Sequence, residues 1–303
     1  MSLLAAGTMA GALMVSSEAS ARTDVFVHGF NPTNANQPAY WNIGTTGDGV
    51  YGFSGNGAET AYNYDYDSTR SWSDVSDNTA PVCALTNAMN LAPGTDMALI
   101  AHSAGGNVVA YMMSAAQNGW ATSCTVTPRT AKAWATYVVT SASPFRGTEM
   151  ADSIYGHGGG GFFQSACQTL GAGVASLVIN SANSMTWSLQ TSFCNTNFTS
   201  LTSYGTYGSI YENGGTGVGG DDGTALQAAG YCANLEGAGV FSTNGSDGVV
   251  SANSAAGCAR GTTVGTQCMP NGHRSWFDGV SHSSNRRNTY NSFATQVWNN
   301  NPY

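Results

Sequence analysis

A serine that could act as a nucleophile lies in residues 96–113, DMALIAHSAGGNVVAYMM. The apolar residues 97–101 predict a short buried strand, and the apolar spacing from Gly105 onward predicts a helix. A turn this tight strains the backbone at Ser103, requires small neighbours, and holds the hydroxyl beside the positive end of the helix. The pattern is typical of a serine that attacks a carbonyl carbon, with Ala101 in place of the usual first glycine. The pattern also suits a small-residue turn that only packs a helix onto a sheet. Residues elsewhere in the chain that could act with Ser103 are needed to distinguish the two interpretations.

A serine nucleophile needs a general base, and five histidines could supply it. They are His28, His102, His157, His273 and His282. His282 follows the strand-like residues 276–280 and precedes a helix, where a base would be presented to the nucleophile. His273, in the polar PNGH loop, is the competitor. His102 is expected to point away from the cleft, and His157 lies among glycines.

The acid that orients the base should lie between the serine and the histidine in chain order. Asp152, Asp221, Asp222 and Asp247 meet that condition. Asp247 stands in NGSDGVV, a turn in which Gly248 permits a close approach, shortly before the proposed base. Asp221 and Asp222 lie in a Gly-rich loop and equally suit a solvated turn or a calcium ligand pair. Asp247 is therefore the predicted acid.

Acyl transfer also needs two backbone N–H groups that point at the developing oxyanion. Ala104 directly follows the candidate nucleophile and supplies one of them. The sequence VFVHGF supplies the other, because Gly29 permits a sharp turn after a predicted strand and lets the N–H of Phe30 point into the site. His28 is then an orienting or packing residue, and Phe30 is also expected to contact the substrate.

These residues need a scaffold that brings distant segments together, and the pattern along the chain predicts one. Strands are predicted at residues 24–27, 59–66, 96–101 and 133–143, and helices at 76–91 and 105–118. Strand-like texture returns at 239–243, 249–250 and 276–280, and residues 288–298 can form a closing helix. This alternation predicts an α/β fold with a mostly parallel sheet and helices on both faces.

Residues 153–230 differ in composition from the segments on either side of them. They hold GHGGGGFF, an amphipathic stretch at 164–188 and Gly-rich turns, which predicts a cap over the sheet rather than another strand–helix unit. The apolar residues of this cap, Phe162 and Phe163 among them, could line a substrate pocket or form the core of the cap itself. One domain at 22–303 with this insertion is the expected organisation.

Composition favours an exported protein. Charged residues are only 9% of the 303 residues, against about 25% in ordinary soluble domains. Residues 3–15 are apolar and Ala19-Ser20-Ala21 fits a cleavage site, so residues 1–21 are predicted to be a signal peptide, although no basic residue precedes the apolar run. The net charge of −8 argues against nucleic acid or an anionic membrane as a partner. We expect a monomer that is extracellular or periplasmic.

Seven cysteines in an exported chain predict disulfides and one remaining thiol. The predicted pairs are Cys258 with Cys268, Cys83 with Cys124, and two of Cys167, Cys194 and Cys232. No spacing of cysteine and histidine is typical of a zinc site, and neither a metal nor a cofactor is expected.

Several motifs occur in the order found in secreted bacterial lipases of the α/β-hydrolase superfamily. These are FVHGF, AHSAGG, SPFRGTEMAD and SDGVV, followed by VSH. The serine turn resembles that of small bacterial lipases without a large lid, and SDGVV resembles the acid turn of larger ones. The resemblance implies Ser103 as nucleophile, Asp247 as acid, His282 as base, and Phe30 and Ala104 as oxyanion donors.

Two positions depart from the larger lipases that these motifs resemble. Ser284 stands where those proteins carry an aspartate that binds calcium, so a calcium site of that type is not expected. Phe145 stands where they often carry histidine.

The resulting hypothesis is a hydrolase of carboxylic esters that acts through an acyl-enzyme. Triacylglycerol, a short-chain ester and a solid polyester, either aromatic or of the polyhydroxyalkanoate kind, remain open as substrates. Acyl transfer to an alcohol is one alternative. A catalytically silent binding protein of the same fold is another, and it could bind glycans through surface tyrosines such as Tyr62, Tyr64 and Tyr66.

Overall fold

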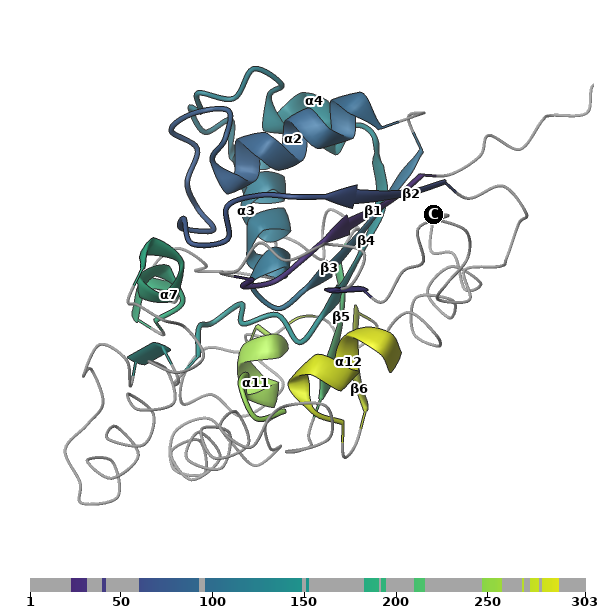
Figure 1. Cartoon of the computed structure of the whole chain (residues 1–303), viewed down its shortest axis with the longest axis vertical. Helices are drawn as coiled ribbons and strands as arrows, with labels where there is room; N and C mark the ends of the chain where they lie inside the picture. The colour runs from purple at the N-terminus through teal and green to yellow at the C-terminus, as the bar shows by residue number, and fades with distance from the viewer. Residues whose placement is uncertain are drawn as a thin grey trace, which may run out of the picture.

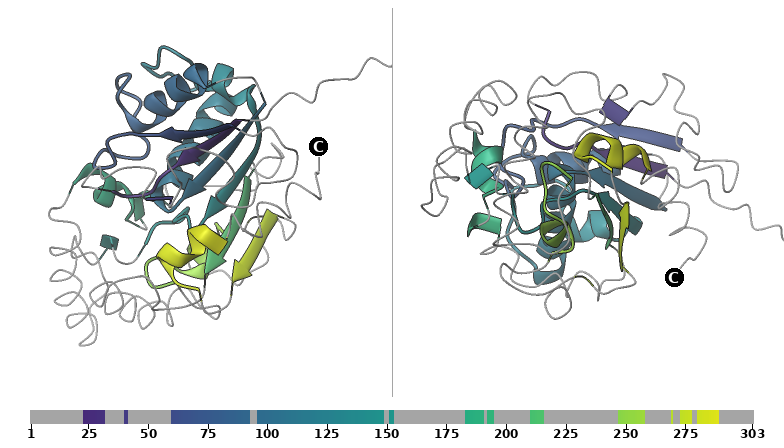
Figure 2. Two further views of the ribbon diagram at one scale, coloured as in Figure 1. Left: turned by 45° about the vertical axis from the view of Figure 1, so that its right-hand side comes forward. Right: turned by 90° about the horizontal axis from the view of Figure 1, so that it is seen from below.

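A six-stranded parallel sheet forms the centre of the molecule. The computed structural model describes residues 23–31, 40–41, 60–92, 96–148, 151–152, 183–190, 192–194, 210–215, 247–257, 269, 273–277 and 280–288. The strands are β1 (Thr23–Val27), β2 (Thr60–Tyr64), β3 (Met97–His102), β4 (Ala135–Ser141), β5 (Ile210–Gly215) and β6 (Arg274–Phe277). They pair in the order β2-β1-β3-β4-β5-β6, every pair parallel. The neighbouring strands and their common twist are visible in Figure 2.

The strand order identifies where a ligand would bind. From β1 the chain moves outward to β2 and then returns to β3 on the other side of β1. In open parallel sheets, ligands bind beyond the carboxyl ends of the strands at such a reversal point. The residues that follow β1 and β3 are His28–Gly29–Phe30 and Ser103, so both predicted segments meet at this edge.

Six helices of the described residues have assigned bounds. They are α2 (Pro81–Leu91), α3 (Ala104–Asn118), α4 (Pro128–Lys132), α7 (Ser184–Ser188), α11 (Ala252–Ala255) and α12 (His282–Asn288). Figure 1 shows α2, α3 and α4 gathered on one side of the sheet, while α11 and α12 lie beside the last strands.

Side-chain contacts place α3 and α12 on opposite faces of the sheet. Thr140 of β4 pairs with Glu212 of β5, so both side chains point to the same face. Thr140 lies against Gly106 of α3, which puts α3 on that face. The next residue of β5, Asn213, points the other way and bonds to Asn285 of α12. The expected α/β fold, with a parallel sheet and helices on both faces, is confirmed.

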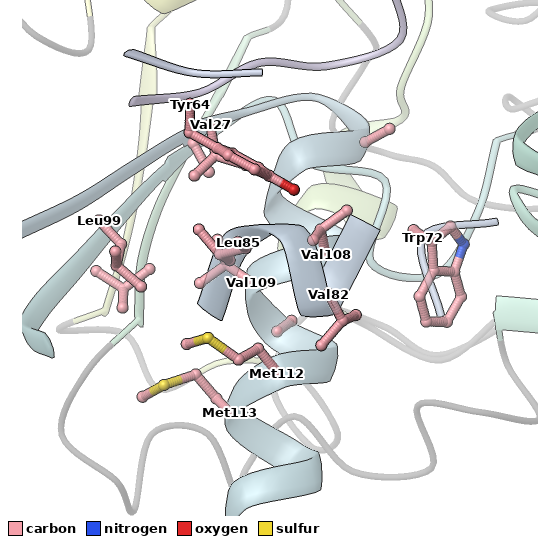
Figure 3. Close-up of a cluster of buried hydrophobic side chains, with 14 of the residues drawn as sticks. Val27, Tyr64, Trp72, Val82, Leu85, Leu99, Val108, Val109, Met112 and Met113 are labelled. Atoms are coloured by element: carbon pink, nitrogen blue, oxygen red, sulfur yellow. The ribbon is translucent and has the colours of Figure 1, made fainter. Parts of the chain in front are cut away.

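The core lies between the sheet and the helices α2 and α3. β1 and β3 are buried along their whole length, since both faces of a parallel sheet are covered. Figure 3 shows strand residues such as Val27 and Leu99 facing Val108, Val109 and Met112 of α3, with Val82 and Leu85 of α2 beside them. Each such side chain contributes about 1.5–3 kcal/mol when it is fully buried.

Most predicted elements of the first half are confirmed, with shifted ends. The helix predicted from residue 76 begins at Pro81, because proline suits the first helical turn and residues 76–80 form turns before it. Residues 249–250, predicted as strand-like, lie in a turn. Residues 239–243 and most of 288–298 lie outside the described residues.

The strand β5 corrects the predicted cap. Residues 210–215 fall inside the range 153–230 but form a strand of the sheet between β4 and β6. A short run rich in Asn and Gly, IYENGG, does not have the apolar character on which the other strands were predicted. Phe162 and Phe163 lie outside the described residues, so the lining of a cap pocket stays a prediction.

One predicted disulfide is present. Cys83 of α2 and Cys124 are bonded, with their Cα atoms 4.7 Å apart, whereas Cys194 is a buried free thiol. Closing a loop of 41 residues stabilises the fold by about 4 kcal/mol in the chain-entropy model. The other four cysteines lie outside the described residues. Among the helices that the structure describes, none has the length and apolar character needed to cross a bilayer.

Candidate active site

Ser103 occupies the sharp turn that the sequence predicts. β3 ends at His102 and α3 begins at Ala104, so Ser103 is the single residue between strand and helix. Its backbone has φ 55° and ψ −133°, a combination that L-residues rarely adopt, and its N–H donates to the carbonyl of Ser141 at 2.8 Å. Although serine is a favoured N-cap residue, the Ser103 hydroxyl makes no capping bond with α3. The hydroxyl is therefore not used to cap the helix.

Glycines permit the close approach of two backbone segments at this serine. A Cβ on Gly29 would lie only 2.6 Å from the Cβ of Ser103, and one on Gly105 would lie 2.5 Å from the carbonyl oxygen of Val27. Real Cβ atoms essentially never come so near. The segment after β1 consequently packs directly against the turn after β3.

The peptide groups before Phe30 are fixed by three hydrogen bonds. The His28 carbonyl accepts from the hydroxyl of Tyr66 at 2.8 Å, and the N–H of Gly29 donates to the hydroxyl of Tyr40 at 3.0 Å. The Gly29 carbonyl accepts from Nδ1 of His28 at 2.7 Å. In a trans peptide the next N–H points opposite to that carbonyl. The N–H of Phe30 therefore points away from the His28 ring.

His28 acts as an orienting residue, as predicted. Burial lowers its pKa to about 4, so the ring is neutral at pH 7 and carries a proton on Nδ1 for the Gly29 carbonyl. The ring also stacks on Tyr66, with centroids 4.2 Å apart.

Asp247 and His282, 35 residues apart in the sequence, form a buried pair. Nδ1 of His282 lies 2.9 Å from Oδ2 of Asp247, and the backbone N–H of His282 donates to the Asp247 carbonyl at 2.9 Å. The His282 side chain is 8% exposed and the Asp247 side chain 1%. Since a carboxylate only accepts, Nδ1 of His282 carries a proton and donates it to Asp247.

The turn after Asp247 holds its other carboxylate oxygen. Oδ1 accepts the N–H groups of Val249 at 2.9 Å and Val250 at 2.8 Å. This is why residues 249–250 form a turn instead of the predicted strand. The carboxylate is oriented by backbone on one side and by His282 on the other.

His102 contacts the first residue of α12. Its Nε2 lies 3.0 Å from the carbonyl oxygen of His282, and the two rings have centroids 4.8 Å apart. The start of α12 passes beside its ring, and the prediction that His102 points away from the cleft stays a prediction. This contact brings the residue before Ser103 against His282. Among the described residues, no hydrogen bond joins the Ser103 hydroxyl to His282; in active sites that bond often forms only in the complex with substrate.

The remaining candidates have other roles. His273 is half-buried, stacks on Tyr211 with centroids 4.5 Å apart, and bonds through Nδ1 to the Ile210 carbonyl at 3.1 Å. It thus packs against the beginning of β5. Tyr64 and Tyr66 are 2% and 4% exposed, so they are not the surface tyrosines that a binding protein would use.

Some predicted residues contribute to packing or lie outside the described residues. Phe145 is fully buried in the core, and Asp152 is 8% exposed. Ser284 accepts from the hydroxyl of Ser281 at 3.2 Å. His157, Asp221 and Asp222 lie outside the described residues.

Sequence reasoning missed three residues that shape the site. Tyr40 bonds to Gly29 and His102, Asn285 anchors α12 to β5, and Glu212 is a fully buried carboxyl beside Ser143. Burial raises the pKa of Glu212 to about 8. Only Glu212 had a local signal, an acidic residue within a strand, and that strand was itself not predicted.

Comparison with known proteins identifies the fold. The sequence matches no protein-family model, and it matches no curated protein. The structure resembles Bacillus licheniformis lipase BlEst2 in its mature form, with a TM-score of 0.59 and 16% identity over 92% of this chain and 93% of that one. Lipase 1 from Pelosinus fermentans has a TM-score of 0.55 and 17% identity over 91% of this chain and 98% of that one. The metagenomic carboxyl esterase MGS0156 has a TM-score of 0.54 and 11% identity over 94% of this chain and 77% of that one. The chain has the α/β-hydrolase fold.

Proposed function

We propose that the protein is a serine hydrolase of carboxylic esters, with Ser103 as nucleophile, His282 as base and Asp247 as acid. The observation that carries the proposal is the buried Asp247–His282 pair, held by His102 against a strained serine turn. A lone serine turn would serve packing equally well. Packing alone would not require an imidazole beside this turn with its Nδ1 bonded to a carboxylate.

In the proposed mechanism, Nε2 of His282 takes the proton of the Ser103 hydroxyl as Oγ bonds to the ester carbonyl carbon. The alcohol then leaves with that proton and the acyl-enzyme remains. Water attacks the acyl carbon while His282 accepts a proton, which returns to Ser103 Oγ as the acid product departs. Asp247 keeps the imidazole in the required tautomer and stabilises its charged form.

The N–H groups of Phe30 and Ala104 are the proposed oxyanion donors. Neither has an acceptor among the described residues, which suits groups that wait for a substrate oxygen. Each would contribute about 3 kcal/mol to transition-state stabilisation. Ala104 is also the first residue of α3, whose N-terminal dipole favours negative charge at the same point.

The proposed substrates are carboxylic esters because two of the similar structures are lipases and one is a carboxyl esterase. The test is hydrolysis of p-nitrophenyl esters from acetate to palmitate by the wild type and by Ser103→Ala. We expect turnover that Ser103→Ala removes without a change in the melting temperature, together with labelling of Ser103 by a fluorophosphonate. Turnover near that of the wild type in Ser103→Ala would exclude this serine.

The chain-length profile separates the open substrate classes. Rates that rise toward palmitate indicate a lipase, and a preference for acetate indicates an esterase or polyester hydrolase, to be followed by assays on polymer films. Butanol added as a competing acceptor measures acyl transfer. No turnover at any length, with no labelling, would favour a binding protein of this fold.

We further propose that the protein is secreted. The Cys83–Cys124 disulfide and the low content of charged residues support this, since disulfides persist in oxidising compartments. Dithiothreitol is expected to lower the melting temperature of the exported protein. An unchanged melt, with seven titratable thiols in the untreated protein, would contradict secretion.

A further inference from the structure

A chain of hydrogen bonds connects the loop after β1 to the beginning of α12. The N–H of Gly29 donates to the Tyr40 hydroxyl at 3.0 Å, and that hydroxyl lies 2.5 Å from Nδ1 of His102. Nε2 of His102 lies 3.0 Å from the carbonyl oxygen of His282. Three segments that are far apart in the sequence are joined through two side chains.

The proton positions along this chain follow from its two ends. The His282 carbonyl can only accept, so Nε2 of His102 carries the proton and donates. In a neutral imidazole Nδ1 is then an acceptor, and the Tyr40 hydroxyl must donate to it. The lone pairs of that hydroxyl remain for the Gly29 N–H. One arrangement of protons therefore gives each of these three hydrogen bonds a donor and an acceptor.

Both bridging side chains stay neutral at working pH. Burial lowers the pKa of His102 well below its usual value, and the nearby His282 and Arg286 lower it further. Burial raises the pKa of Tyr40. The hydroxyl therefore keeps its proton, and Nδ1 of His102 keeps its lone pair.

We propose that Tyr40 and His102 form a positioning bridge that ties the oxyanion-donor loop, His28–Gly29–Phe30, to the base-bearing residue His282. This inference rests on the proposed function. Neither side chain touches the reacting atoms in the proposed mechanism, so both are positioning residues. The bridge sets the distance between the proposed oxyanion donor Phe30 and the proposed base His282, which lie far apart in the sequence.

A second contact links the same two regions. The guanidinium carbon of Arg286 lies 4.7 Å from the centroid of the Tyr40 ring, in a cation–π arrangement. Arg286 stands one helical turn after His282 in α12. Tyr40 thus holds α12 through its ring as well as through His102.

The principal test is Tyr40→Phe, which removes the hydroxyl and keeps the ring. We expect kcat for ester hydrolysis to fall about 10- to 100-fold, because a misplacement of about 1 Å has costs of this size. KM should change less than about threefold, since a positioning bridge acts on the transition state rather than on uniform binding. An unchanged kcat would overturn the proposal.

The matched control is Tyr64→Phe. Tyr64 is buried, and its hydroxyl donates to the Pro81 carbonyl at 2.6 Å, away from the bridge. Both variants lose one hydrogen-bonded tyrosine hydroxyl, and the loss at the half-buried Tyr40 should lower the melting temperature no more than the loss at Tyr64, while only Tyr40→Phe lowers kcat. Equal kcat losses in the two would indicate a general effect on stability and would also overturn the proposal.

Variants at His102 test the second half of the bridge. His102→Gln retains an amide donor for the His282 carbonyl, whereas His102→Leu removes both bonds, so Gln should recover part of the kcat that Leu loses. Tyr40→Phe combined with His102→Leu should lose little more than His102→Leu alone, because the two act as one unit. Fully multiplicative losses would show that they act independently.

Imidazole ¹⁵N NMR detects the bridge without turnover. Wild type and Tyr64→Phe should show His102 as the Nε2–H tautomer at neutral pH, and Tyr40→Phe should shift its Nδ1 resonance and alter the His282 signals. If the wild type hydrolyses no ester and Ser103 is not labelled, the proposed function fails while these spectra still test the coupling. Unchanged His282 signals in Tyr40→Phe would overturn the bridge alone.

Discussion

The Ser103 side and the Asp247–His282 side of the candidate site are held in different ways. Around Ser103, the backbone segments approach so closely that Gly29 and Gly105 have no room for a Cβ. Around His282, side-chain hydrogen bonds connect segments 35, 72 and 180 residues apart in the sequence. Close steric contact distinguishes the first side, where hydrogen bonds also hold the peptide groups before Phe30, whereas the second side depends on polar bonds. Changes in side-chain volume should therefore damage one side, and losses of single bonds the other.

The largest effect is expected at His282, the proposed base. His282→Ala should lower kcat for ester hydrolysis about 10⁴- to 10⁶-fold, because a triad loses nearly all its power with its base. His273→Ala is the control, since His273 packs on Tyr211 at the other end of β5. It should change the melting temperature and leave kcat within about threefold. The reverse pattern would move the base to His273.

Gly29→Ala tests the steric side. Its Cβ would lie 2.6 Å from the Cβ of Ser103, so the loop must shift and carry the Phe30 N–H with it. We expect kcat to fall about 10²- to 10³-fold, as for the loss of one oxyanion donor.

Gly119→Ala is the matched glycine control for that change. Gly119 ends α3 at φ +64° with nothing within 4 Å of the added Cβ. It should cost about 1–2 kcal/mol of stability through its positive φ and leave kcat unchanged. If both variants lose stability but retain kcat, the close approach at Gly29 is not part of the site.

Asn285→Ala tests the polar side. Asn213 and Asn285 exchange two bonds, Nδ2 to Oδ1 at 3.0 Å and Nδ2 to the backbone carbonyl at 2.7 Å, and both residues are fully buried. The loss of these two hydrogen bonds should cost about 1–3 kcal/mol of stability, since buried polar groups of Asn213 are left unsatisfied. It should also lower kcat about tenfold by loosening α12.

Asn118→Ala is the control for the loss of an asparagine bond. Its side chain donates to the Ser114 carbonyl at 2.9 Å at the exposed end of α3. The stability change should stay within about 0.5 kcal/mol. Equal melting temperatures for the two asparagine variants would show that α12 does not depend on the amide pair.

The last prediction concerns the pH dependence of stability and not kcat. Burial raises the pKa of Glu212 from 4.5 to about 8. The folded state therefore holds a proton that the unfolded state releases between those values, and stability falls as pH rises through this range, by at most about 1.4 kcal/mol per unit. Glu212→Gln keeps an acceptor for the Ser143 N–H and should flatten this slope. Melting temperatures from pH 4.5 to 8.5 measure it, and parallel curves would contradict it.

The same contrast explains what could be predicted from the sequence. The steric side consists of short motifs, VFVHGF and AHSAGG, whose residue types follow from local backbone geometry, and both segments lie where they were predicted. Asp247 and His282 were found because chain order and turn chemistry restrict them. The strand β5 and the residues Tyr40, His102 and Asn285 depend on partners far along the chain. A sequence shows the polarity of such residues but not the partner that satisfies it.

The amide pair between β5 and α12 also affects how the protein ages. Asn213 is followed by Gly214, a dipeptide whose asparagine readily cyclises to a succinimide and hydrolyses to aspartate or isoaspartate. In the fold, the extended strand and the bonds to Asn285 oppose that cyclisation. Once heat unfolds the chain, the protection ends, and a carboxylate formed at position 213 would face the Oδ1 atom of Asn285 on refolding. Heat inactivation should therefore become irreversible through covalent change at this strand, and faster at alkaline pH.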